Sequence, residues 1–150
     1  MKKILIAAAV IMMVSALGGI ALAAGTTTVN VSANIVGTCQ FSTTPTLAFG
    51  ALDQTSGAPA TATGTLSFWC TKGAAYTLSD PLGSTGTYSG SISNGTDTIA
   101  YSIGYTNATG SGTGKTSPIS STLNATILNT DYVDVSAGAY AGTVQFTIAP

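Results

Sequence analysis

Apolar and polar residues alternate within the stretch Thr26–Val36, close to the N-terminus. Four apolar residues fall on one side of an extended chain here: Val29, Val31, Ala33 and Ile35. The positions between them hold Asn and Ser. A period of two with β-branched residues on the apolar side predicts a half-buried β-strand. The residues from Thr28 to Val36 would span roughly 30 Å at about 3.3 Å per residue. The strand either belongs to its own domain or fills a groove in another one, and the alternation leaves both interpretations open.

The same alternation recurs downstream at short intervals and predicts further strands. The clearest is Thr98–Tyr105, where Ile and Tyr share one face. The other expected strands are Leu47–Gly50, Thr65–Cys70, Tyr76–Leu78, Leu123–Ile127, Val133–Val135 and Tyr140–Ile148. Turn-forming residues separate them, and no helix longer than one turn is expected. Short strands at this spacing predict an all-β fold, an antiparallel two-sheet sandwich of immunoglobulin-like type.

Every second residue of these strands is expected inside the sandwich. The expected core is Leu66, Phe68, Ile99, Tyr101, Ile103, Val144, Phe146 and Ile148. Between the strands, Ala51–Ala60 and Asn107–Pro118 are expected to be surface loops, and Asn94-Gly95 is typical of a tight hairpin turn.

The first residues have the layout of a secretory signal peptide. Two Lys residues precede an apolar run over Ile4–Val14, and the small-residue pattern Ala21-Leu22-Ala23 follows. This pattern and the Gly18-Gly19 pair favour cleavage over a retained membrane anchor. We therefore expect residues 1–23 to be a signal peptide and the remainder to be an exported domain.

Composition after the signal peptide excludes several classes of function. Two Lys stand against five Asp, a formal charge of −3, and the chain contains no Arg, His or Glu. A nucleic-acid partner requires a basic patch, which this composition does not supply. No base is available to activate a Ser or Thr nucleophile, so neither an enzyme nor a cofactor is expected.

Cys39 and Cys70 are the two cysteines of the chain. In an exported protein an even number of cysteines predicts a disulfide. Such a bond would stabilise the fold by roughly 3–4 kcal/mol in the chain-entropy picture. A metal site is the alternative, but two thiolates without His or Glu form a poor ligand shell, so no metal is expected.

Several segments resemble the spore coat protein U domain, a family shared with pilin subunits of the archaic chaperone–usher type. The segments that carry the resemblance are Gly37-Thr38-Cys39, Leu47–Asp53 (LAFGALD), Ala62–Tyr76 (ATGTLSFWCTKGAAY), Thr98–Ile103 (TIAYSI) and Val135–Ile148 (VSAGAYAGTVQFTI). Together they extend over essentially the whole chain after the signal peptide.

The resemblance implies a sandwich that lacks its last strand and is completed by a strand from another protein, a form of β-augmentation. Residues 24–37 would then be an N-terminal donor-strand segment, and residues 38–150 a pilin domain. Val29, Val31, Ala33 and Ile35 would fill pockets in the neighbouring subunit.

The resemblance also implies partners and a location. The partners would be neighbouring pilin subunits, a periplasmic chaperone that lends a strand, and an outer-membrane usher. The chain would pass through the periplasm into a cell-surface fimbrium that supports adhesion and biofilm formation.

Two other functions remain open from the sequence. One is a self-contained coat or matrix protein that folds without a partner. The other is a carbohydrate-binding adhesin in which Trp69 and Tyr76 would form an aromatic platform. Dependence on a co-expressed chaperone separates the pilin from the coat protein, whereas glycan binding by the monomer would favour the adhesin.

Overall fold

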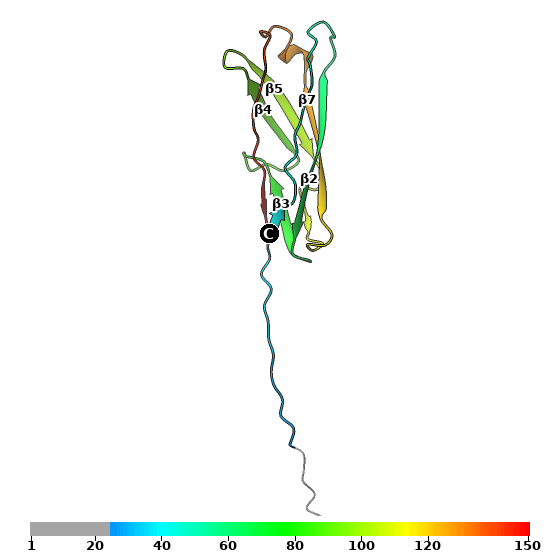
Figure 1. Cartoon of the computed structure of the whole chain (residues 1–150), viewed down its shortest axis with the longest axis vertical. Coiled ribbons are helices and arrows are strands. Elements are labelled where there is room, and N and C mark those ends of the chain that lie inside the picture. The colour runs from blue at the N-terminus through cyan, green and yellow to red at the C-terminus, as the bar shows by residue number, and fades with distance from the viewer. Residues whose placement is uncertain (1–24) are drawn as a thin grey trace, which may run out of the picture. The chain divides into compact units, whose positions relative to one another are not determined.

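The computed structural model describes residues 25–150 (Figure 1), so the predicted signal peptide lies outside the described residues. The chain divides into a domain, Ile35–Pro150, and the segment before it. No helix in the described range is long and apolar enough to span a membrane.

Two antiparallel sheets build the domain. The larger sheet has the order β1-β2-β7-β5-β4, with β1 (Cys39–Phe41), β2 (Ala60–Cys70), β4 (Thr87–Ser93), β5 (Thr98–Tyr105) and β7 (Ile119–Ile127). The smaller sheet has the order β6-β3-β8, with β3 (Ala75–Ser79), β6 (Thr109–Ser111) and β8 (Thr147–Ala149). A 3₁₀ helix, Asn129–Asp131, follows β7. The predicted all-β, immunoglobulin-like sandwich is confirmed.

The core lies where the inner faces of the sheets meet. In β5 every second residue is buried, and in β2 the side chains of Leu66, Phe68 and Cys70 are buried while Trp69 is only partly so. Phe68 of the larger sheet meets Tyr76 of the smaller one edge to face, with ring centroids 5.1 Å apart. Aromatic pairs in this geometry add to the stability gained by burial, so this contact helps to hold the sheets together.

A disulfide joins β1 to β2. Cys39 and Cys70 are directly opposite in the antiparallel register, with an S–S distance of 2.03 Å and a Cα–Cα distance of 4.1 Å. The structure therefore contains the predicted bond. It attaches the start of the domain to the longest strand.

Three expected core residues are less buried than the prediction stated. Val144, Phe146 and Ile148 are half-buried and pack against the core rather than within it. Phe146 contacts Tyr105 edge to face at 5.1 Å between ring centroids. Val144 and Phe146 remain partly exposed because they border an open groove.

Two expected strands near the C-terminus differ from the structure. Val133–Val135 forms a turn, because the N–H groups of Tyr132 and Val133 both donate to the Asn129 carbonyl oxygen, at 3.2 and 3.0 Å, and continue the helical turn. Tyr140–Ile148 is extended, but only its last residues enter β8. Before β8, this segment pairs with another strand among the described residues only through a single bridge between Ala141 and Ser93.

Two further expectations need correction. Leu47–Gly50 belongs to no strand, because no neighbouring backbone pairs with it among residues 25–150. The loop expected over Asn107–Pro118 contains the short strand β6, which pairs with β3 through Ala75 and Ser111.

The segment at the N-terminus alternates apolar and polar residues but pairs with no strand among the described residues. Residues 25–38 form neither helix nor strand, so the strand expected over Thr26–Val36 is absent from the single chain. The side chains of Val29, Val31 and Ile35 are 77%, 90% and 82% exposed. No strand within the described residues provides hydrogen-bond partners for this segment.

Candidate functional site

The chain leaves the larger sheet soon after β1 and then has no partner strand. Ser42 N–H still donates to the Ser67 carbonyl oxygen at 2.8 Å, and Ser67 N–H donates to Thr43 Oγ1 at 2.8 Å. From Thr43 to Leu52 no further residue joins a ladder. We call Thr43–Leu52 the N-terminal wall.

A second unpaired segment lies near the C-terminus. Gly142–Phe146 runs from the isolated bridge at Ala141 to the start of β8 and belongs to no ladder. We call Gly142–Phe146 the C-terminal wall. Because this wall leads directly into β8, it extends the edge of the smaller sheet.

A glycine in β2 lets the N-terminal wall cross onto the inner face of the larger sheet. Gly64 occupies an inward-facing position between Ala62 and Leu66, both of which are buried. A Cβ atom at Gly64 would lie only 3.1 Å from Leu47 Cδ2. The missing side chain therefore leaves room for Leu47, and this wall lies on the same side of the larger sheet as the smaller one.

An open groove separates the two walls. Its first part is a hollow of about 460 Å³, bordered by residues of both walls. The floor of this hollow is the inner face of the larger sheet and consists of Leu66, Tyr101, Ile103, Leu123 and Ala125. Most of these side chains are aliphatic, and burial raises the pKa of the Tyr101 phenol. A charge placed on this floor would therefore be strongly disfavoured.

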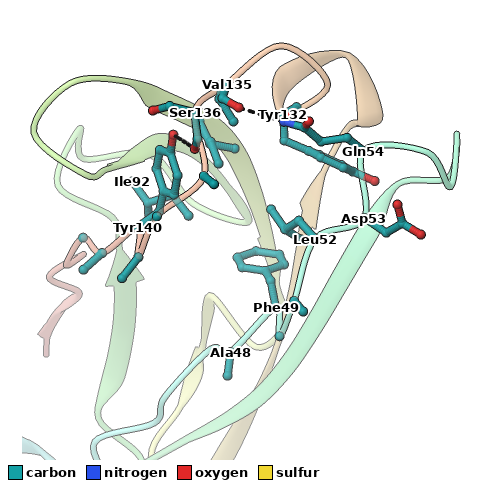
Figure 2. A pocket seen from close by; sticks show the side chains of 18 of the residues that line it. Ala48, Phe49, Leu52, Asp53, Gln54, Ile92, Tyr132, Val135, Ser136 and Tyr140 are labelled. Atoms are coloured by element: carbon teal, nitrogen blue, oxygen red, sulfur yellow. Dashed lines mark hydrogen bonds between the residues drawn. The ribbon is translucent and has the colours of Figure 1, made fainter.

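The groove continues into a second hollow of about 940 Å³ at the far end of the sandwich. Figure 2 shows Phe49 and Leu52 on one side of it, and Ile92 and Tyr140 on the other. The two walls thus border open space along most of their length.

Burial along the walls alternates as it would in strands. Leu47 and Phe49 in one wall, and Val144 and Phe146 in the other, are half-buried, whereas their neighbours are exposed. The half-buried side chains pack on the core but border the open groove. A β-strand placed between the walls would cover these side chains and offer hydrogen bonds to both unpaired backbones.

Side-chain hydrogen bonds organise the far end of the groove. Gln54 Nε2 donates to the carbonyl oxygens of Tyr132 and Val135, at 3.0 and 2.8 Å (Figure 2). Tyr132 is buried, and its hydroxyl donates to the Ala58 carbonyl oxygen at 2.7 Å. These bonds join the loop that precedes β2 to the turn that follows β7.

Asp97 anchors the chain that leads to the C-terminal wall. Ser136 donates to Asp97 Oδ2 through its hydroxyl and through its N–H at 2.8 Å. These two bonds, the hydroxyl first, hold the pKa of Asp97 below its usual value. The Tyr140 hydroxyl in turn donates to the Ser136 carbonyl oxygen at 2.8 Å (Figure 2). The approach to the C-terminal wall is therefore firmly held although the wall itself is unpaired.

Sequence reasoning predicted a donor segment and placed Leu66, Tyr101 and Ile103 in the core, but it did not predict that they form the floor of an open groove. The candidate donor residues Val29, Val31, Ala33 and Ile35 are exposed. Gln54, Tyr132 and Ser136 were missed because polar residues in turns carry no periodicity. The alternation of Leu47 and Phe49, between Pro45 and Gly50, was the available signal for the N-terminal wall.

The groove is suited to binding an extended peptide. Its surface offers two unpaired backbones and an apolar floor. No group of three or more His, Cys, Asp or Glu side chains within residues 25–150 is arranged to hold a metal ion.

A comparison with known protein families places these features in context. The family model for the spore coat protein U domain matches residues 25–147. The matched range includes the N-terminal segment, the disulfide and both walls of the groove. No curated protein and no solved structure shows significant similarity to the chain.

Proposed function

Because the chain belongs to the spore coat protein U domain family, we propose that it is a structural subunit of an extracellular chaperone–usher pilus that polymerises by donor-strand exchange. The observation that carries the proposal is the groove between the N-terminal and C-terminal walls, where one strand is missing between two unpaired backbones. Each subunit would receive a strand in this groove and donate its own N-terminal segment, residues 24–37.

The missing strand accounts for the otherwise unfavourable features of the domain. Unpaired strand edges promote aggregation, and native proteins usually cover them. A donated strand would pair with both walls and cover their half-buried side chains, such as Val144 and Phe146, which border the open groove. The same groove would be filled by a periplasmic chaperone before the subunit reaches an outer-membrane usher.

The N-terminal segment has the pattern that this groove requires. Val29, Val31, Ala33 and Ile35 would face the floor, while the Asn and Ser residues between them would face solvent. The two Val and the Ile expose most of their surface in the single chain. Burying these three side chains gives a gross gain of roughly 4–9 kcal/mol. Hydrogen bonds along the strand would add to this, so the fibre should be long-lived and able to support adhesion and biofilm formation.

Substitutions on the two faces of the segment test the proposal. Val31→Asp together with Ile35→Asp would place two charges on the apolar floor, at a cost of several kcal/mol. We expect polymer ladders on unheated denaturing gels to disappear, while the chaperone-bound monomer persists because the receiving groove is unchanged. The matched control is Asn30→Asp with Ser32→Asp, which adds the same charges on the solvent side and should preserve the ladders.

The alternative results are informative. Normal ladders from the Val31→Asp and Ile35→Asp variant would contradict donation of this segment. A wild-type chain that folds as a monomer without a chaperone would instead support the self-contained coat or matrix protein.

A further inference from the structure

Six of the seven charged side chains of the domain gather at two ends, and the seventh, Asp80, is buried after β3. Lys72 follows β2, and Lys115 lies with its Nζ 5.8 Å from the centre of the Trp69 ring. A backbone hydrogen bond of 2.8 Å from Gly73 N–H to the Gly112 carbonyl oxygen joins the two loops that carry these lysines. Both lysines are exposed. We call this the lysine end.

Carboxylates gather at the other end. Asp53 lies in the loop before β2, Asp97 between β4 and β5, and Asp131 and Asp134 in the helical turn after β7. The side-chain bonds of Gln54 and Ser136 bring these three loops together. We call this the aspartate end, and its residues are Asp53, Asp97, Asp131 and Asp134.

The two ends are well separated within one domain. β2 begins at Ala60, on the side of the aspartate end, and finishes at Cys70, two residues before Lys72. Its 11 residues extend over about 33 Å at roughly 3.3 Å per residue. This distance exceeds the Debye length of about 8 Å at physiological salt, so the charges of the two ends interact little within a subunit.

The donor segment is attached at the lysine end. Thr38 N–H donates to Thr71 Oγ1 at 3.0 Å, and Thr71 N–H donates to the Thr38 carbonyl oxygen at 2.9 Å. A Cβ atom at Gly37 would lie 3.6 Å from Ala74 Cβ. The chain therefore joins the domain beside Lys72.

The groove extends from one end of the domain toward the other. Asp53 and Ser136 line the larger hollow, at the aspartate end. Phe41, the last residue of the disulfide-bonded β1, lines the smaller hollow, toward the lysine end. A donated strand must therefore place the body of its own domain at one end of the acceptor or at the other.

Charge distinguishes these two arrangements. If the donor's body lies at the acceptor's lysine end, two positive ends meet. If it lies at the acceptor's aspartate end, two lysines meet four carboxylates. Only Gly37 and Thr38 separate Val36 from Cys39, a distance of roughly 10 Å when extended. The facing ends thus lie about one Debye length apart, close enough for their charges to interact.

We propose that, in the fibre, the lysine end of each subunit docks against the aspartate end of the second copy whose groove its N-terminal segment fills. This inference rests on the proposed function, and it adds a contact between the domain bodies to the donated strand. The contact favours one orientation of the strand and makes assembly dependent on salt.

Charge reversal tests the contact, using chaperone-bound full-length subunits that assemble in vitro. At low salt, Lys72→Asp with Lys115→Asp should slow assembly about two- to tenfold, the range for a pair of exposed charge contacts. Adding Asp131→Lys and Asp134→Lys, which do not line the groove, to the same chain restores the wild-type net charge. It also brings the aspartate end from four negative charges to a net charge of zero, so the repulsion is removed and the rate should recover to about that of a chain with a neutral lysine end. At about 0.5 M salt these differences should vanish.

The neutral variant Lys72→Gln with Lys115→Gln serves as the control for folding and should give an intermediate rate. Equal rates for the wild type and the Lys72→Asp, Lys115→Asp variant at low salt would overturn the inference and leave donor-strand exchange intact. The inference would also be overturned if the variant with all four substitutions assembled as slowly as the variant with two. Absence of polymer from the wild-type chain would instead overturn the proposed function, and this inference with it.

Discussion

Supplying the missing strand as a synthetic peptide should stabilise the domain. The perturbation combines a chain that begins at Gly37 with a peptide of sequence Thr26–Val36. Without its own segment, this chain keeps the open groove between Thr43–Leu52 and Gly142–Phe146. The peptide should bind there, because its apolar side matches the groove floor.

The size of the effect follows from mass action. A ligand that binds only the folded state at a concentration 100 times its Kd adds about 2.7 kcal/mol to the free energy of unfolding. For a domain of this size the midpoint of thermal unfolding, Tm, should then rise by about 10 °C. The binding energy itself comes from burying Val29, Val31 and Ile35, now 77%, 90% and 82% exposed.

Variant peptides provide the contrast between the two faces of the strand. A Val31→Asp peptide places a carboxylate over the floor, and a loss of about 2–3 kcal/mol raises its Kd roughly 30- to 160-fold. At the same concentration it should add only about 0.6 kcal/mol, a rise in Tm of roughly 2 °C. An Asn30→Asp peptide, altered on the solvent side, should retain nearly the full rise.

The assay is thermal unfolding followed by circular dichroism at increasing peptide concentration. Equal rises in Tm with the wild-type and Val31→Asp peptides would refute the assignment of Val31 to the floor. At about 1 mM peptide, even a weak site with ~4 kcal/mol of binding free energy would be half filled. If Tm does not rise at any peptide concentration up to this value, the groove is refuted as a strand-binding site.

Two further predictions concern the domain itself. Gly112→Ala would place a Cβ atom 2.2 Å from the Thr71 carbonyl oxygen. Unfolding measurements in denaturant should therefore show that the free energy of unfolding falls by about 2–4 kcal/mol. The control is Gly104→Ala, which should change the stability little because its Cβ atom would have its nearest neighbour at 3.9 Å. Hydrogen bonds from Ser136 lower the pKa of Asp97, so its stabilising contribution is present above the unfolded pKa and is lost as the pH falls through the lower folded value. The Tm difference between the wild type and Asp97→Asn should therefore be largest near pH 7 and shrink below about pH 4; a difference that stays constant with pH would show that the Asp97 charge contributes nothing.

The strands with a strict alternation of buried and exposed side chains could be predicted from the sequence. Thr98–Tyr105 is an example, and its expected boundaries agree with β5. A side chain's direction in a strand depends only on its position along the chain, so burial on one face is recorded directly in the sequence. The disulfide was predictable for a similar reason, since an exported chain with two cysteines has one intramolecular pairing.

The groove depended on the tertiary structure. Leu47–Gly50 and Tyr140–Ile148 have the alternation of strands, yet most of their residues have no partner in the described chain. Alternation reports which side chains face the core, whereas a ladder requires a second backbone at hydrogen-bonding distance. The position of that second backbone is set by the crossing of Leu47 over Gly64 and by the entry of the C-terminal wall into β8.

The two charged ends also depended on the tertiary structure. Lys72 and Lys115 are far apart in the sequence, as are Asp53, Asp97 and Asp134, and no local pattern relates them. The antiparallel pairing of β2 with β7 brings the loops at each end together. The sequence alone determines only the net charge of the domain. The charges separate into a positive and a negative end because antiparallel strands bring loops that are distant in the sequence to the same end of the domain.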